Sequence, residues 1–358
     1  MRIFTRPILE INLENLLDNF KTLQKLANGA KAAAVVKDDA YGLGAVEIVK
    51  KLYNDGGCRD FFVAHALEGA KIAKYVPKAK VYVLQGIGAD SLALFQKHKF
   101  IPVISSYEVF LYWMRHKIKG IKPMINIETG LNRLGFRENE LKLLSESHKK
   151  EFSMVMSHFS CADEAGHLMN DRQVERFDFL RKKYLLAGLP TSLAASDGVF
   201  LGKKYMGDMV RLGGAVYGLN TAPYHSIKMK NVVRVLAPVL EVTEIKKGEY
   251  AGYGATYQAQ KDEMIAIASI GYGDGLPRAL SNKHNILGRV SMDNIIIKGQ
   301  GLKAGGYAEI MGPDYDQDAM GKDAGTIGYE ILSRIGKGMR YRKRYLGSWC
   351  EEKQGFSS

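Results

Sequence analysis

The sequence has little cysteine and no long apolar run. Its three cysteines, Cys58, Cys161 and Cys350, lie far apart and are odd in number, which excludes a disulfide scaffold and any CxxC-type zinc site. No HxH or HExxH spacing indicates another metal site. No apolar stretch approaches the ~18–20 residues of a membrane span, and the N-terminus lacks the apolar core of a signal peptide. We therefore expect a cytoplasmic protein that binds neither a metal nor a membrane.

Acidic residues are few relative to basic ones. There are 51 Lys and Arg against 38 Asp and Glu, a net charge of +13, so nucleic-acid binding has to be considered. No helix-turn-helix, zinc finger or RNP pattern accompanies the charge, and one dense basic run, MRYRKRY at 339–345, has the composition of a charged edge strand. We expect no nucleic-acid partner, because a protein that handles an anionic cofactor would be similarly basic.

The first two thirds of the chain alternate between two patterns. Amphipathic helical stretches, with apolar residues at i, i+3, i+4 and i+7, separate eight short apolar runs, and another helix is predicted over 12–28. The runs cover residues 32–37, 60–65, 80–85, 101–105, 122–128, 152–160, 191–196 and 208–218. Eight such units predict an α/β fold, a parallel (β/α)8 TIM barrel.

Beyond residue 218 the pattern changes to short strands punctuated by Gly, Asp and Asn, with little helix. We therefore predict a barrel over 1–225 and a mostly β C-terminal domain over 226–358, with a strand within residues 1–12 packing on the second domain.

Active sites of such barrels lie at the carboxyl ends of the strands. The residues at those ends are Lys37, His65, Gln85, Ser105, Glu128, His158, Ser196 and Arg211. Lys37 is unusual, because it ends an apolar strand. Either it has simply reached the surface, or it is a partly desolvated amine with a lowered pKa that can form a Schiff base.

Other positions allow an ordinary structural interpretation when taken alone. Ser196 and the run Arg211–Gly214 end the last two strands, where barrels often hold a phosphate. His158, inside an apolar stretch, is typical of a hydrogen-bonded core histidine. Tyr253 and the pair Met292–Asp293 fit strand and turn positions.

Eight motifs in order then carry a resemblance to a known family. They lie at 34–44 (AVVKDDAYGLG), 126–136, 157–164, 209–218, 251–257 (AGYGATY), 270–278, 288–294 and 326–332. Together they resemble the alanine racemase family over essentially the whole length. The resemblance implies a barrel followed by a β domain, pyridoxal 5′-phosphate as cofactor, and interconversion of L- and D-alanine by two bases, which supplies D-alanine for peptidoglycan.

The resemblance also implies roles for individual residues. Lys37 would carry the cofactor and act as the base on the D side, and Tyr253 would be the base for the L-enantiomer. The other cofactor-binding residues would be Tyr41, His158, Ser196, Arg211, Gly213, Gly214 and Tyr329. The substrate would contact Arg133, Met292 and Tyr272, and the corridor to the site would include Asp163, Arg278 and Arg289.

In this family the tyrosine base and the methionine reach the site from the other subunit. A single chain would then lack its second base, so the resemblance implies an obligate head-to-tail homodimer with shared sites.

Three positions depart from the family pattern. Asn126 stands where many members have a carbamylated lysine, Ala195 precedes Ser196 in place of asparagine, and Ser192 replaces a histidine. Neutral Asn126 cannot supply a charge beside Arg133. We therefore expect a small anion such as chloride, held by the Asn126 amide and Arg133, unless an acidic residue such as Glu128 supplies the charge.

Two other functions remain open at this point. One is a broad-specificity or serine racemase on the same scaffold. The other is a non-catalytic pyridoxal-phosphate-binding protein, which the C-terminal motifs disfavour because such proteins resemble the barrel alone.

Overall fold

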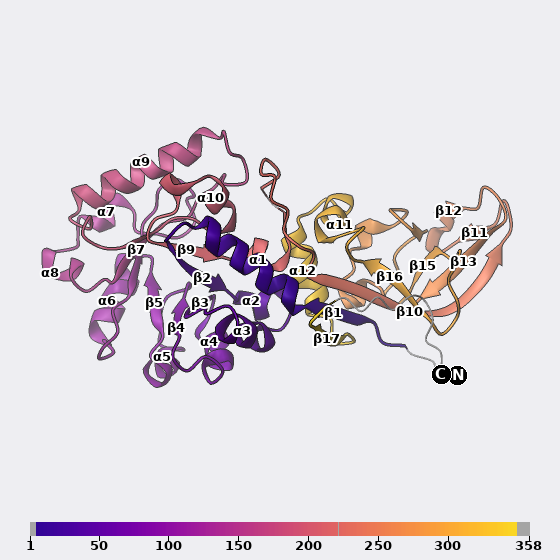
Figure 1. Cartoon of the computed structure of the whole chain (residues 1–358), viewed down its shortest axis with the longest axis horizontal. Helices are drawn as coiled ribbons and strands as arrows, with labels where there is room; N and C mark the ends of the chain where they lie inside the picture. The colour runs from indigo at the N-terminus through magenta and orange to yellow at the C-terminus, as the bar shows by residue number, and fades with distance from the viewer. Residues whose placement is uncertain (1–4, 221, 349–358) are drawn as a thin grey trace.

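Eight parallel strands form a barrel at one end of the molecule. In this computed structural model, which describes residues 5–220 and 222–348, they follow the order β8-β7-β6-β5-β4-β3-β2-β9 (Figure 1). A bridge between Ala195 and Arg211 links the two ends of the sheet, so the barrel is nearly closed. The predicted (β/α)8 barrel is confirmed. Its strands are β2 (Lys31–Val35), β3 (Asp60–Val63), β4 (Lys80–Val83), β5 (Ile101–Ile104), β6 (Met124–Asn126), β7 (Met154–Met156), β8 (Thr191–Ser192) and β9 (Met209–Leu212).

Helices surround the barrel, as their apolar spacing predicts. The first, α1 (Leu13–Leu26), begins where the Asn12 side chain accepts from the Asn15 N–H at 2.9 Å, and it buries Leu16, Phe20 and Leu23 on one face. The others are α3 (Ala45–Asn54), α4 (Ala66–Ala73), α5 (Leu92–His98), α6 (Tyr107–Arg115), α7 (Glu138–Leu141), α8 (Glu146–Lys149), α9 (Leu168–Lys183) and α10 (Ser196–Phe200), with short 3-10 turns η1 (Lys203–Tyr205) and η2 (Gly214–Tyr217).

The second part of the molecule is built on one long strand, β10 (Val233–Ile245). It pairs with three others and extends away from the barrel (Figure 1). The N-terminal strand β1 (Ile8–Asn12) belongs to this sheet, between β10 and the edge strand β17 (Arg342–Leu346). The remaining strands are β11 (Tyr250–Ala251), β12 (Tyr257–Gln258), β13 (Glu263–Ala268), β14 (Ile286–Leu287), β15 (Ile295–Lys298) and β16 (Tyr307–Met311).

The β domain contains more helix than expected. Two helices, α11 (Gln317–Ala324) and α12 (Gly328–Gly336), follow β16. The buried positions of α12, Ile331, Leu332 and Ile335, have helical spacing, but glycines at both ends of a nine-residue helix obscure that pattern in the sequence. Three 3-10 turns complete the domain: η3 (Tyr253–Ala255), η4 (Tyr272–Asp274) and η5 (Arg278–Leu280).

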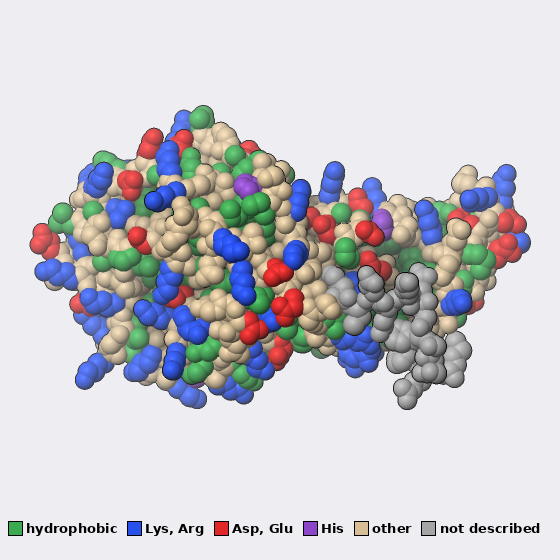
Figure 2. Space-filling model, in the orientation of Figure 1, with side chains coloured by type: hydrophobic (Ala, Val, Ile, Leu, Met, Phe, Trp, Pro, Cys, Tyr) green, Lys and Arg blue, Asp and Glu red, His purple; other side chains and the backbone are tan. Residues whose placement is uncertain are grey.

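The second half of the basic run at 339–345 lies in the charged edge strand β17, as the sequence predicts, and Arg340 lies in the turn before it. The guanidinium of Arg344 lies 3.4 Å from Glu10, and Arg340 pairs with Asp274 and Asp293. Elsewhere on the face shown in Figure 2, Lys and Arg are spread over both parts of the molecule with Asp and Glu among them. The excess positive charge is therefore dispersed on this face.

Within the described ranges, no helix has the length and apolar character needed to cross a membrane, and no group of three or more His, Cys, Asp or Glu is placed to hold a metal ion. Cys58 and Cys161 are free thiols. Cys350 lies outside the described residues.

Candidate active site

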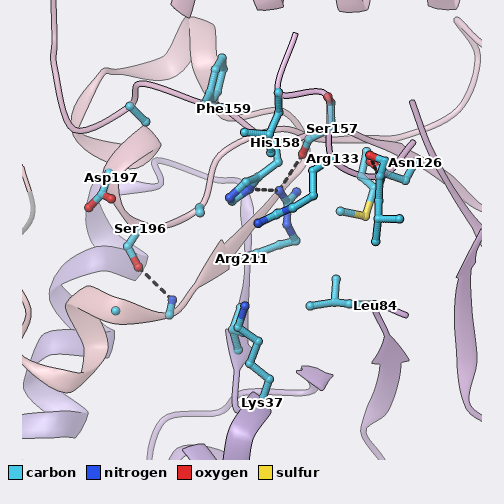
Figure 3. Close-up of a pocket in the computed structure, with 18 of the residues that line it drawn as sticks. Lys37, Leu84, Asn126, Arg133, Ser157, His158, Phe159, Ser196, Asp197 and Arg211 are labelled. Carbon is cyan, nitrogen blue, oxygen red and sulfur yellow. Dashed lines mark hydrogen bonds between the residues drawn. The ribbon is translucent and has the colours of Figure 1, made fainter. Parts of the chain in front are cut away.

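A cavity of about 480 Å³ opens at the carboxyl ends of the barrel strands. It brings together Lys37, Arg133, His158 and Arg211, whose side chains converge in Figure 3. Seven other predicted site residues also line it: Tyr41, Asn126, Asp163, Ser196, Gly213, Gly214 and Tyr329.

Lys37 does not end the first barrel strand, as we expected, but begins a turn two residues after it. This turn, α2 (Lys37–Tyr41), contains four consecutive non-glycine residues, 38–41, with φ between 54° and 56°. The left-handed conformation costs roughly 1–2 kcal/mol per L-residue. Surrounding contacts must therefore impose it, and they fix the direction of the Lys37 side chain.

Glu68 provides one of those contacts, and the sequence analysis missed it. Its carboxylate accepts from the Asp38 N–H at 2.8 Å and from the Ala64 N–H at 2.7 Å, so it ties the lysine turn to the end of β3. The Asp39 carboxylate accepts from the Ala45 N–H at the start of α3, at 3.0 Å. A glutamate three residues after the helix N-cap is a capping signal, and it could have identified Glu68.

The environment of Lys37 favours the neutral amine. Burial lowers the pKa of Lys37 below its usual value, the positive charge of Arg133 lowers it further, and Glu68 and Asp38 oppose the shift. This is the direction expected for a lysine that acts as a nucleophile and a base.

Arg211 is the most firmly held residue of the cavity. It is buried, and its two terminal nitrogens donate to the carbonyl oxygens of Ser192 at 2.8 Å, Ser157 at 2.7 Å and Leu193 at 3.1 Å, and to the Ser192 hydroxyl at 2.6 Å. The serine that replaces the family's histidine therefore does support the arginine. Burial and Arg133 lower the pKa of Arg211 to about 10, so it stays protonated near neutral pH.

His158 is neutral beside it. Burial, Arg211, Arg133 and Lys37 lower the pKa of His158 to about 3. Its Nδ1 lies 3.2 Å from Nη2 of Arg211. Because a guanidinium can only donate, Nδ1 accepts this bond and the single ring proton is on Nε2.

In another part of the cavity lining, two tyrosine hydroxyls lie so close to two glycines that no side chain fits there. A Cβ at Gly213 would lie 2.5 Å from the Tyr41 hydroxyl, and one at Gly214 would lie 2.2 Å from the Tyr329 hydroxyl. The Ser196 hydroxyl accepts from the Gly213 N–H at 2.9 Å. Burial raises the pKa of Tyr41 well above its usual value, so its hydroxyl remains a neutral donor. Hydroxyl and backbone donors in this arrangement suit a phosphate.

Asn126 does not have the arrangement that we expected. Its Nδ2 donates to the Leu134 carbonyl at 2.8 Å and to the Ser105 hydroxyl at 3.3 Å. Both amide hydrogens are used within the chain, which leaves none for an anion. Asn126 instead holds the backbone next to Arg133. Glu128 also lines this cavity, and its carboxylate accepts from the Gly130 N–H.

The candidate residues of the β domain lie elsewhere. Among the described residues, the lining of the Lys37 cavity includes none of Tyr253, Tyr272, Met292, Arg278 and Arg289. The side chains of Tyr253 and Met292 are 72% and 54% exposed. In the sequence, Tyr253 lies between β11 and β12, two strands that Figure 1 shows at the end of the β domain remote from the barrel.

Most of the strand-end positions singled out in the sequence line the cavity. They are Lys37, Gln85, Glu128, His158, Ser196 and Arg211. Ser105 contacts the site through Asn126, and exposed His65 is the N-cap residue of α4. The sequence analysis also missed Ser157 and Asp197, which line the cavity beside His158 and Ser196.

Comparison with protein families assigns both parts of the chain. Residues 11–221 match the family model "Alanine racemase, N-terminal domain", and residues 232–345 match "Alanine racemase, C-terminal domain".

Curated proteins and solved structures agree with these matches. The chain is 35% identical to the biosynthetic alanine racemase of Agrobacterium fabrum, covering 94% of this chain and 93% of that protein, and 36% identical to the catabolic one, covering 94% and 92%. Alanine racemase from Bartonella henselae, solved with covalently bound pyridoxal phosphate, is 31% identical with a TM-score of 0.86, covering 95% of this chain and 99% of that one.

Proposed function

The chain belongs to the alanine racemase family, and on that premise we propose that it interconverts L- and D-alanine with pyridoxal 5′-phosphate as cofactor. Curated relatives at 35–36% identity carry this activity in their names, and the Bartonella henselae structure holds the cofactor covalently. The observation that carries the proposal is the amine of Lys37, half-buried in a basic cavity at the carboxyl ends of the barrel strands.

The cavity fits this cofactor in both charge and shape. Tyr41, Ser196, Tyr329 and the glycine backbone at 213–214 would hold the phosphate, because the missing Cβ atoms let the two tyrosine hydroxyls approach that backbone. Lys37 would bond to the aldehyde carbon. Arg211 uses Nη1 and Nη2 on the protein, and we assign its Nε–H to the ring nitrogen.

The bound cofactor would supply an electron sink that makes the α-hydrogen of the attached amino acid acidic. The residues around it determine where protons move. Protonated Arg211 can donate a hydrogen bond to the ring nitrogen but gives up its proton poorly, which keeps that sink weak. Lys37, with its lowered pKa, exchanges a proton with the α-carbon on one face. Exposed Arg133 would bind the substrate carboxylate.

Racemisation needs a second base on the other face of the α-carbon. We assign this role to Tyr253 of a second chain, with Met292 and Tyr272 beside it. The exposure of Tyr253 and Met292 in the single chain supports that assignment, since large apolar or aromatic side chains at an interface are exposed when the partner is absent. The active protein would then be a head-to-tail homodimer whose two sites are shared.

The biological role that we propose is the supply of D-alanine for peptidoglycan in the cytoplasm. Growth of a D-alanine auxotroph that expresses this chain, on medium without D-alanine, would support it. Failure of an expressed and active chain to restore growth would contradict it.

A racemisation assay over a panel of amino acids tests the activity directly. The purified holoenzyme is incubated with each single enantiomer of alanine, serine and larger amino acids, and the other enantiomer is quantified while the visible absorbance of the cofactor is recorded. We expect the highest kcat/KM with alanine. Bound cofactor without turnover on any amino acid would instead favour a cofactor-binding protein, and equal turnover of serine would favour a broad-specificity racemase.

A further inference from the structure

The basic run of the sequence has a place in the fold that its charge alone does not explain. Residues 337–345, here named the basic segment, lie between α12 and the end of β17. Their cations and tyrosine contact two separate parts of the chain: the loops that carry Tyr272 and Met292, and the turn that carries Lys37.

Arg340 makes the first of these connections. Its Nε donates to Oδ1 of Asp274 at 2.6 Å and Nη2 donates to Oδ2 of the same carboxylate, while Nη1 lies 3.0 Å from Oδ1 of Asp293. Asp274 is completely buried, whereas the side chain of Asp293 is 60% exposed. One guanidinium therefore joins two carboxylates that are nineteen residues apart in the sequence.

The two carboxylates belong to two loops that are themselves bonded. The N–H of Tyr272 donates to the Ser291 carbonyl at 3.0 Å, and the N–H of Gly273 donates to the Met292 carbonyl at 2.9 Å. A Cβ at Gly271 would lie only 2.3 Å from that Met292 oxygen, so the backbones are in direct contact. Tyr272 and Met292 are thus carried by one rigid unit, which Arg340 clamps through Asp274 and Asp293.

Lys343, three residues further on, makes the second connection. Its amine donates to the Gly42 carbonyl at 2.6 Å, and the Tyr345 hydroxyl donates to the Leu43 carbonyl at 3.0 Å. Lys337 pairs with Asp38 at 2.7 Å. These contacts add to that of Glu68 in supporting the left-handed turn that begins at Lys37.

We propose that the basic segment positions parts of two different active sites: Arg340 acts in trans, on the loops presented to the partner subunit's site, and Lys343 acts in cis, on the lysine turn of its own chain. This inference rests on the proposed function and on its shared sites. Neither residue is a catalytic residue, because each acts through other groups.

The geometry makes Arg340 irreplaceable by a simple cation. A guanidinium bonds a carboxylate through two parallel N–H groups and still has a donor for a second carboxylate, whereas an ammonium is a point charge. Arg340→Lys keeps the charge beside buried Asp274 but removes this fork. Displacing the two loops by as little as 1 Å would lower kcat/KM about tenfold to a hundredfold.

The first measurement is of kcat, KM and cofactor absorbance in homodimers whose two chains carry the same substitution. We expect Arg340→Lys to raise the KM for alanine more than it lowers kcat, because Tyr272 and Met292 are assigned to the substrate, and to leave the absorbance of the bound cofactor unchanged. Asp293→Asn should have a smaller effect in the same direction. Because Asp293 is exposed, this variant keeps the test valid if Arg340→Lys does not fold.

Lys343→Met should change the cofactor absorbance and lower kcat.

Mixed dimers separate action in trans from action in cis. Two differently tagged chains are co-expressed, and the heterodimer is isolated by sequential affinity steps. In a dimer of one Lys37→Ala chain and one Arg340→Lys chain, the intact Lys37 belongs to the Arg340→Lys chain. It faces loops from the Lys37→Ala chain, whose Arg340 is normal, so that site should recover the wild-type kcat/KM. In a dimer of Lys37→Ala with Lys343→Met, the intact Lys37 and the altered contact are in one chain, so activity should stay low.

A third mixed dimer distinguishes failure of this proposal from failure of its premise. Lys37→Ala with Tyr253→Phe should also regain one working site if sites are shared. An inactive wild-type enzyme would refute the proposed function, and no recovery in this third dimer would refute sharing. Recovery there, but not in the dimer of Lys37→Ala with Arg340→Lys, would overturn the action of Arg340 in trans. Wild-type kinetics in the homodimers of both Arg340→Lys and Asp293→Asn would overturn its role altogether. Recovery with Lys343→Met, or a Lys343→Met homodimer with wild-type kinetics, would overturn the role in cis.

Discussion

The barrel and the β domain present their candidate site residues on surfaces of opposite character. In the barrel, Lys37, His158 and Arg211 line one cavity, and several hydrogen bonds hold Arg211 in place. In the β domain, Tyr253 and Met292 are exposed, and the structure places neither in a cavity with Lys37. On the function proposed above, the barrel would build the cofactor site, and the β-domain side chains would act only against a second chain.

The largest loss of activity is expected from a substitution in the barrel. Lys37→Ala should abolish racemisation in both directions and the visible absorbance of the bound cofactor, because no other amine is assigned to bond to it. The control is Lys25→Ala, at an exposed position on α1, which should behave as wild type. Near-normal turnover by Lys37→Ala without added amine would contradict the assignment.

A large effect is also expected from the exposed surface of the β domain. Tyr253→Phe should lower turnover ~10²–10⁴-fold, as for the loss of a general base, mainly from L to D, with cofactor absorbance retained. Tyr250→Phe is the matched control, since Tyr250 is 59% exposed in the same hairpin. If Tyr253→Phe keeps more than about a tenth of the rate, the β domain does not supply the second base.

Buried His158 predicts that the stability of the protein decreases at acidic pH, an effect that the exposed residues of the β domain should not cause. An unfolded chain protonates His158 near pH 6.5, and the folded one only near pH 3, so the unfolded state binds more protons between these values. Stability is therefore lost as pH falls through this window, by about 2 kcal/mol at pH 5. His158→Asn keeps an acceptor for Arg211, and its denaturation midpoint should fall less between pH 7 and pH 5. Parallel curves for the two proteins would contradict a neutral, buried His158.

The smallest effect concerns Asn126. Because both of its amide hydrogens are bonded within the chain, replacing chloride by a bulky anion such as gluconate at constant ionic strength should leave kcat and KM unchanged. Glu128→Gln, which removes the carboxylate from the Arg133 side of the cavity, should alter KM more than the change of salt does. A clear loss of activity without chloride would restore the anion hypothesis.

The sequence predicted the barrel and most of its site because apolar runs locate parallel strands, and their carboxyl ends meet at one rim. It did not predict the turn after Lys37, because residues 38–41 are not glycine and their left-handed conformation comes from contacts distant in the sequence. Glu68 carries a local capping signal, but its bond to the Asp38 backbone comes from another helix and could not be predicted from that signal. The direction in which the Asn126 amide donates depends on which acceptor oxygens the fold places within hydrogen-bonding distance, and the sequence does not contain that information.

The lysine turn has a consequence for how the chain becomes competent during synthesis. Gly42 and Leu43 receive their bonds from Lys343 and Tyr345, which are made about three hundred residues later. A ribosome releases the barrel first, and domains generally fold in that order. A nascent barrel therefore lacks these contacts with the segment that follows Lys37 until β17 is translated and pairs with β1. Chains that end before β17 lack this support, so the turn at Lys37 has its full set of contacts only in molecules whose synthesis has passed Tyr345.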